Sequence, residues 1–127
     1  MADQKKKKIL IVEDEEILSE MYQDSFAREG FEVVTAATGQ EAVDVAKAEK
    51  PDFVLLDMIL PSEDGIYFLK EKRKDPEIRS IPVVAFSAYD HPDTKKETLE
   101  LGVQDYLLKT SYTPHQIINK VKKYVLQ

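Results

Sequence analysis

The sequence contains no cysteine, only four glycines and two histidines, and no long apolar run. Without cysteine the protein forms no disulfide bond and offers no thiolate to a metal, and we expect it in the reducing cytoplasm. No apolar run approaches the roughly 20 residues of a membrane-spanning helix, so we expect no membrane insertion. The glycines form no phosphate-cradling loop. His91 and His115 lack the spacing of a metal-binding pair, and we expect both on the surface.

Positive charge is in the minority: 18 Lys and Arg stand against 24 Asp and Glu, which gives a formal net charge of -6. Direct binding of nucleic acid needs clustered positive charge that displaces counterions, so this balance argues against it. The 127 residues, 43% hydrophobic and 33% charged, suit one ordinary globular domain. We therefore expect a single domain over residues 1–127, in which residues 1–8 are a polar lead-in without the apolar centre of a secretory signal.

Short apolar runs recur along the chain and predict strands. They are rich in Val and Ile and almost continuously apolar, as strands are in a parallel sheet that is covered on both faces. The five runs lie at residues 9–12, 31–35, 53–56, 81–86 and 106–108.

The stretches between these runs have the spacing of amphipathic helices. Gly30 and Gly102 are expected to end two of them, and Pro51 and Pro76 follow two others. Thr113 is expected to cap the last helix, with Pro114 at its first position. The stretch 94–101 has the weakest apolar pattern. Five such strand–helix units predict an α/β fold with a doubly wound, five-stranded parallel sheet and helices on both faces.

Chemically active side chains follow four of the five apolar runs. Glu13 and Asp14 follow the first, Asp57 the third, Ser87 the fourth and Lys109 the fifth. Because the carboxyl ends of parallel strands lie at one edge of a sheet, we expect these residues to converge.

Such a set suits the handling of a phosphoryl group. Three neighbouring carboxylates repel one another and favour a hard cation such as Mg²⁺, which often bridges a carboxylate and a phosphate. An aspartate can itself accept a phosphoryl group as a nucleophile. Mg²⁺, Lys109 and the Ser87 hydroxyl would neutralise and position that group.

Taken singly, each residue has a simpler interpretation. Asp14 could cap the following helix, and Asp57 could belong to a turn, since Pro61 and Gly65 indicate a loop nearby. Ser87 could be a loop hydroxyl and Lys109 a surface charge. Their joint occurrence at four strand ends favours a common site.

Over nearly its whole length the chain resembles the receiver domains of two-component response regulators. The likeness is carried by five segments in the same order and with the same separations as in that family. They are "ILIVEDEE", "GFEVVTAATGQEAV", "PDFVLLDMILPSEDG", "IPVVAFSA" and "LGVQDYLLK", at residues 9–16, 30–43, 51–65, 81–88 and 101–109. The resemblance implies the flavodoxin-like strand order 2-1-3-4-5, which is also the order of the chemotaxis receiver that serves as a standard example of this fold.

The resemblance also implies roles for the site residues. Asp57 would be the phosphoacceptor, and Asp14 and Asp57 would bind Mg²⁺ directly. The backbone carbonyl of Ile59 would be the third protein ligand, and Glu13 would act through water. Lys109 would pair with the phosphoryl oxygens.

The same likeness implies a switch. Ser87 would be drawn towards the phosphoryl group, and Tyr106 would turn inward into the space that Ser87 leaves. The face built from the fourth helix, fifth strand and fifth helix would then change its preference for partners.

The sequence departs from the family pattern in two places. Thr110 replaces the proline that usually follows the lysine, often after a cis bond. A cis bond before any other residue costs about 2.5–4 kcal/mol, so either the bond is trans and Lys109 moves somewhat, or the loop is strained. Ile59 and Tyr89 occupy the two positions that flank the attacking water, and neither carries a carboxylate or an amide. We therefore expect slow self-dephosphorylation.

The leading hypothesis is a signalling switch, not an enzyme with a separate substrate, which takes its phosphoryl group from a sensor histidine kinase or a phosphotransfer protein. It would act on an unknown output protein, as a monomer or weak dimer. One alternative is a Mg²⁺-dependent phosphohydrolase with an aspartyl-phosphate intermediate, but Ile59 stands where such enzymes need a second acid. The other alternative is an interaction module that takes no phosphate. The sequence leaves open whether the domain stands alone or belongs to a longer regulator.

Overall fold

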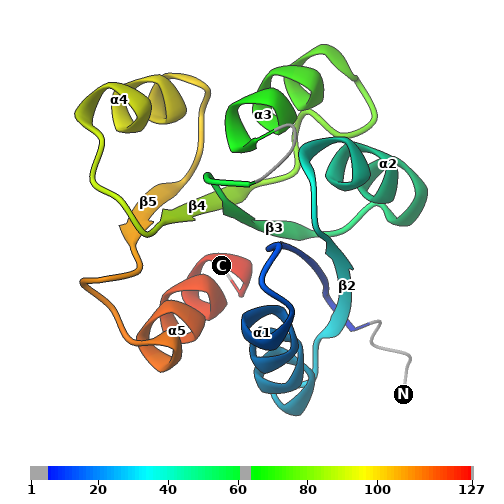
Figure 1. Ribbon diagram of the computed structural model, residues 1–127. Helices are drawn as coiled ribbons and strands as arrows, with labels where there is room; N and C mark the ends of the chain where they lie inside the picture. Colours follow the sequence, from blue (N-terminus) through cyan, green and yellow to red (C-terminus); the bar gives the residue numbers. More distant parts are fainter. Residues whose placement is uncertain (1–5, 61–63, 127) are drawn as a thin grey trace.

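In the computed structural model, which describes residues 6–60 and 64–126, strands and helices alternate along the chain (Figure 1). The strands within these described residues are β1 (Lys8–Val12), β2 (Glu32–Ala36), β3 (Phe53–Asp57), β4 (Val83–Ser87) and β5 (Asp105–Leu108). The helices are α1 (Glu16–Arg28), α2 (Gly39–Glu49), α3 (Gly65–Lys74), α4 (Pro92–Glu100) and α5 (Pro114–Val125).

The strands form a single parallel sheet with the order β2-β1-β3-β4-β5. The predicted fold class and strand order are therefore confirmed. Strand order reverses between β1 and β3, and in such sheets the crevice at the carboxyl ends of these two strands is where ligands bind.

Helices cover both faces of the sheet, with α1 and α5 on one face and α2, α3 and α4 on the other (Figure 1). Side chains of β1 alternate between the two layers, because successive residues of a strand point to opposite faces. Leu10 and Val12 pack in the layer of α2 and α3, whereas Ile9 and Ile11 pack in the layer of α1 and α5. All four side chains are buried, which explains why the strand reads as a continuous apolar run.

Local sequence signals account for the helix ends. Gly30 and Gly102 adopt φ values of 94° and 91° after α1 and α4, which glycine reaches without steric cost. Thr113 caps α5 through its side chain, and Gln116 completes a capping box. Both predicted glycine stops and the predicted cap are found at their expected positions.

Two strands begin later than predicted. Phe31 precedes β2 because its amide donates to the carbonyl of Phe26 and closes the end of α1. β4 begins at Val83, two residues later than predicted, since Pro82 has no amide hydrogen for the strand ladder.

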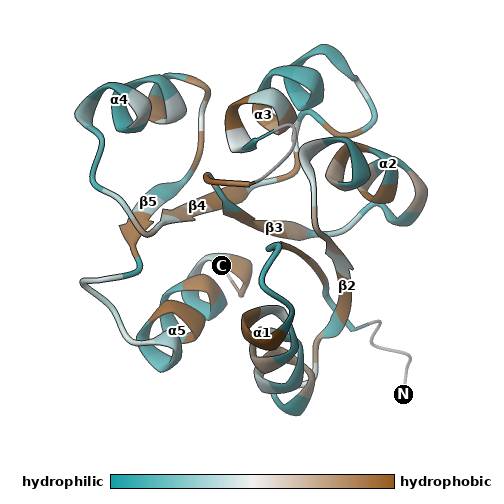
Figure 2. Ribbon diagram, in the orientation of Figure 1, coloured by the Kyte–Doolittle hydropathy of each residue, from teal (hydrophilic) through white to brown (hydrophobic). Residues whose placement is uncertain are grey.

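The helix α4 is the most weakly anchored. Thr98 alone is buried among the residues of α4, all of which the structure describes. Figure 2 shows this helix mainly in hydrophilic colours, in contrast to the strands beside it. Across residues 6–60 and 64–126, no helix combines the length and apolar character needed to cross a membrane.

Candidate functional site

The fold brings the chemically active residues to one edge of the sheet. Asp57 is the last residue of β3, and Ser87 is the last residue of β4. Glu13 directly follows β1, and Lys109 directly follows β5. The strand registers explain this placement, because Val12 pairs with Leu56, Asp57 with Phe86, and Ser87 with Leu108.

Lys109 joins two of the carboxylates. Its Nζ atom lies 2.9 Å from Oε1 of Glu13 and 3.0 Å from Oδ2 of Asp57. Both distances are within hydrogen-bonding range, and both bonds join an ammonium to a carboxylate. One ammonium group therefore holds together the carboxyl ends of β1, β3 and β5.

Burial shapes the protonation of the site. Glu13 and Asp57 are each only 3% exposed. Burial raises the pKa of Glu13 to about 7 against the opposing hydrogen bond from Lys109. Burial likewise raises the pKa of Asp57, in spite of hydrogen bonds from the Ile59 amide and Lys109. Removal from water disfavours a carboxylate, and the paired cation offsets only part of that cost.

Lys109 shows the opposite balance. Burial acts to lower its pKa, but the hydrogen bond to Glu13 and the charge of Asp57 outweigh burial, and the pKa is raised. Lys109 therefore stays charged and partly neutralises the acidic cluster.

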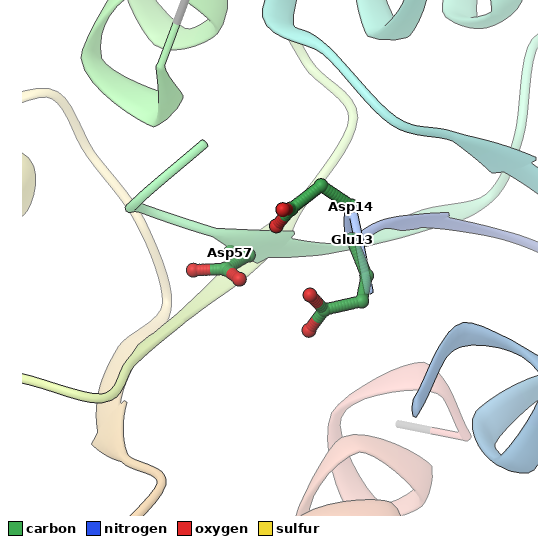
Figure 3. A group of neighbouring side chains, drawn as sticks. All are labelled: Glu13, Asp14 and Asp57. Atoms are coloured by element: carbon green, nitrogen blue, oxygen red, sulfur yellow. The ribbon is translucent and has the colours of Figure 1, made fainter. Parts of the chain in front are cut away.

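Asp14 completes a group of three carboxylates. One oxygen from each of Glu13, Asp14 and Asp57 can be chosen so that all three lie within 4.8 Å of one another. Figure 3 shows the three side chains at the ends of β1 and β3, with the carboxylates of Glu13 and Asp14 turned towards Asp57. Asp14 is exposed and does not cap α1, whose N-cap is Glu15.

This donor set fits Mg²⁺. It consists of oxygen atoms alone, it is close enough to share one ion, and it carries more negative charge than Lys109 can neutralise. The exposed carboxylate of Asp14 leaves a side open to water, which Mg²⁺ tends to retain.

The loops after β3 and β4 hold the neighbouring polar groups. The amide of Ile59 donates to Oδ1 of Asp57 at 2.9 Å. The role of the Ile59 carbonyl as a ligand of Mg²⁺ stays a prediction. Ser87 is buried, and its Oγ accepts a hydrogen bond from the amide of Tyr89 at 3.2 Å. Pro61, expected in the loop after Asp57, lies outside the described residues.

Tyr106 is buried, with 7% of its surface exposed. It belongs to the core layer beside α3, and its hydroxyl is buried without a hydrogen-bond partner among the described residues. An uncompensated buried hydroxyl is costly, which suits a side chain with a second accessible position.

The bond before Thr110 leaves Lys109 within hydrogen-bond reach of the acidic residues. None of the peptide bonds that the structure describes is cis, so the bond between Lys109 and Thr110 is trans. Lys109 nevertheless reaches Glu13 and Asp57. His91 and His115 are exposed, as expected.

Two residues at the site carried no functional signal in the sequence. Phe86 lies below Lys109, with its ring centroid 4.7 Å from Nζ, but within an apolar run it reads as an ordinary core residue. Gly65 begins α3 so close to Met58 that an added Cβ would lie 2.9 Å from the Met58 Cα. This close approach leaves no room for a side chain at the start of α3, and the sequence shows only a glycine near a turn.

Comparison with known proteins agrees with this arrangement. Residues 9–122 match the family described as the response regulator receiver domain. The chain is 39% identical over 116 residues to the alkaline phosphatase synthesis transcriptional regulatory protein PhoP of Bacillus subtilis. That match covers 91% of this chain and 47% of PhoP, so the chain spans about half the length of this relative.

Solved structures give the same result. The phosphorylated cyanobacterial phytochrome response regulator RcpA superposes with a TM-score of 0.79 at 34% identity, over 94% of this chain and 91% of RcpA. The BeF3-activated N-terminal receiver domain of RstA from Klebsiella pneumoniae gives a TM-score of 0.82 at 30% identity, over 95% of this chain and 100% of that domain. The chain belongs to the receiver domain family of two-component response regulators.

Proposed function

We propose that Asp57 accepts a phosphoryl group from a phosphohistidine of a sensor histidine kinase or phosphotransfer protein, and that residues 1–127 act as one receiver domain. The observation that carries this proposal is the pairing of Lys109 with the buried carboxylate of Asp57, beside Glu13 and Asp14. A buried carboxylate held next to a fixed cation at the switch point of the sheet is positioned to act as a nucleophile and to have its product neutralised.

In the transfer, a carboxylate oxygen of Asp57 attacks the phosphorus atom of the donor. The new O–P bond forms as the P–N bond to histidine breaks, and the bonding electron pair stays on the imidazole nitrogen, which takes up a proton from solvent. Lys109 moves its hydrogen bond from Oδ2 of Asp57 to a phosphoryl oxygen, and the Ser87 hydroxyl donates to another. These groups supply position and charge neutralisation, which are the main demands of phosphoryl transfer.

Mg²⁺ would be held by Asp14, Asp57 and the carbonyl of Ile59, with Glu13 acting through water. When bound, the ion supplies the positive charge that the three carboxylates lack. The hydrogen bond from the Ile59 amide to Oδ1 of Asp57 orients the carboxylate.

The signal would leave the domain through the face of α4, β5 and α5. The weak anchoring of α4 supports this, because elements that move are drawn from the least stable parts of a fold. Tyr106 on β5 joins this face to the site, since its strand pairs with β4, which ends at Ser87. A shift of Ser87 would thus be transmitted to the output partner through Tyr106.

The product of this chemistry is the protein's own phosphorylated form. A phosphohydrolase would need a proton donor close to Asp57 on the leaving-group side, and Ile59 has none. Turnover of a small phosphate ester at enzyme-like rates would favour that alternative.

Intact-mass spectrometry after treatment with acetyl phosphate and Mg²⁺ tests the proposal. The wild type should gain the mass of one phosphoryl group, and Asp57→Asn should gain none. Asp44→Asn is the matched control, because Asp44 is an exposed aspartate on α2 and should leave labelling unchanged. Labelling that survives Asp57→Asn would place the acceptor elsewhere, and an unlabelled wild type would favour a module that takes no phosphate.

A further inference from the structure

Lys109 has to cross a strand to reach Asp57. Asp57 ends β3 and Lys109 follows β5, and β4 lies between them in the sheet (Figure 1). Neighbouring strands lie about 4.8 Å apart, so the two side chains and the hydrogen bond between them together bridge roughly two strand spacings. Whatever β4 presents on that face at that level forms the surface over which the lysine lies.

Strand register identifies this surface as Phe86. Asp57 and Phe86 are register partners, so their side chains leave the same face of the sheet. Phe86 also pairs with Leu107, and Lys109 lies two residues further along, which is again the same face. The ring centroid of Phe86 lies 4.7 Å from Nζ of Lys109, within the range of cation–π attraction.

The ring is held firmly. Phe86 is completely buried, and Tyr22 of α1 packs edge-on against it with a centroid separation of 5.7 Å and an interplanar angle of 83°. The side chain of Lys109 is 17% exposed, so the ammonium is partly removed from water. A cation–π contact gains strength when the cation is desolvated.

We propose that Phe86 is a positioning residue that holds the Lys109 ammonium at the height of Asp57 for phosphoryl transfer, an inference that rests on the function proposed above. Glu13 and Asp57 use two of the three N–H donors of Lys109, and the ring attracts the charge through its quadrupole. The ring has no lone pair, so it does not compete with a phosphoryl oxygen for a donor as a third carboxylate would. Lys109 can therefore exchange Asp57 for the phosphoryl group without leaving its place.

The alternative to a positioning role is that Phe86 only fills the core. A matched substitution separates the two, because Phe26 on α1 is equally buried in the same layer and has an edge contact of its own with Phe31. Phe86→Leu removes a buried ring next to the lysine, whereas Phe26→Leu removes one that stacks on no cation of the site. Both variants lose core packing, and only the first loses the surface under Lys109.

The test measures the initial rate of labelling by acetyl phosphate with Mg²⁺, by intact mass, for the wild type, Phe86→Leu and Phe26→Leu. Phe86→Leu should be labelled roughly two- to thirty-fold more slowly than the wild type, the rate equivalent of one cation–π contact. Phe26→Leu should keep the wild-type rate at a temperature where all the variants are folded. A wild type that takes no label overturns the proposed function and this inference with it. A labelled wild type that Phe86→Leu matches in rate overturns this inference alone, and so does an equal slowing by Phe26→Leu.

A double-mutant cycle with Lys109→Met gives a second measurement that does not depend on labelling. The free energy of unfolding in urea is compared for Phe86→Leu, Lys109→Met and the double variant. If the ring acts through the ammonium, the cost of Phe86→Leu is smaller in the Lys109→Met background than alone. Additive costs would show that Phe86 is core filling and would overturn the proposal.

Discussion

Lys109 Nζ lies 3.0 Å from Oδ2 of Asp57, although 52 residues separate the two in the sequence. The same ammonium also donates a hydrogen bond to Glu13 at 2.9 Å. One cation thus balances two buried carboxylates, and the folded domain carries an excess of buried negative charge. This excess determines how the protein responds to substitution, metal and pH.

Removal of the cation should be costly. Lys109→Met leaves Glu13 and Asp57 buried side by side without a counter-ion, and breaking a buried pair in this way costs on the order of 3–5 kcal/mol. Urea unfolding of the metal-free protein at neutral pH measures the change. Lys120→Met is the control, since Lys120 is half-buried like Lys109 but its Nζ lies over the ring of Tyr112, 5.3 Å from the centroid, and the substitution should cost far less. Equal losses in the free energy of unfolding for the two variants would show that the ion pairs of Lys109 add no stability beyond that of an ordinary lysine.

Removal of one carboxylate should have the opposite sign. Asp57→Asn leaves Lys109 paired with Glu13 alone and abolishes the repulsion between two buried charges. Without metal, this variant should be at least as stable as the wild type, although it cannot be labelled. A variant that fails to fold, as judged by circular dichroism, would show that Asp57 is a structural residue.

Mg²⁺ should relieve the same excess charge. A ligand of the folded state stabilises by RT ln(1 + [L]/Kd), which at ten times Kd is about 1.4 kcal/mol and raises the melting temperature of a domain of this size by a few degrees. The shift should be lost in Asp14→Asn, which removes an exposed carboxylate of the cluster. Calorimetry with and without millimolar Mg²⁺ measures it. If neither Mg²⁺ nor Ca²⁺ shifts the melting temperature, the prediction of a metal site at these carboxylates is wrong.

The raised pKa of Glu13 predicts a pH dependence in the metal-free protein. Its carboxyl has a pKa of about 7 when folded and an ordinary value of 4.5 when unfolded. Between these values the folded state holds a proton that the unfolded chain releases, so the contribution of Glu13 is fully present below the unfolded value and is lost as pH rises towards 7. The raised pKa of Asp57 acts in the same direction.

Unfolding free energies measured with a chelator across this range should therefore fall as pH increases, and Glu13→Gln should flatten the fall. A wild type whose stability rises over the same range, with no difference from Glu13→Gln, would contradict the protonation assigned to Glu13.

Much of the fold could be predicted because burial on both faces leaves a strong signal in the sequence. Runs such as residues 53–56 must be apolar on both sides, and glycines at positive φ mark the helix ends. Strand order could not be derived in this way, since several orders satisfy the same right-handed crossovers, and it rested on the family resemblance. The start of β4 was missed because Pro82 is apolar like its neighbours and differs only in lacking a hydrogen-bond donor.

The residues of the site could be predicted for a simpler reason. Polar groups at the carboxyl ends of buried parallel strands meet at one edge whatever the details of the side chains. What could not be predicted is how these side chains are arranged. The sequence does not show that Glu13 is buried and paired with Lys109, because that depends on rotamers and on the register of strands distant in the chain. The contact between Phe86 and Lys109 could not be predicted, because a phenylalanine in an apolar run is already explained by its place in the core.

The surroundings of Asp57 predict a long-lived phosphorylated state. Ile59 and Tyr89, which flank the attacking water in the family, are 43% and 59% exposed, so neither is committed to the core. Neither carries a group that would orient a water molecule for attack on the phosphoryl group, and a positioned polar group accelerates such steps greatly.

Ile59→Asn should therefore shorten the lifetime of the phosphoryl group by about tenfold or more, because an amide can hold the water in line. The decay is followed by intact mass after acetyl phosphate is removed and Mg²⁺ retained. Leu99→Asn, at an apolar residue of similar exposure on α4, should leave the lifetime unchanged. A wild-type lifetime of only seconds would mean that water is oriented without either side chain, and the exposed Ile59 would then have no bearing on how long the signal lasts.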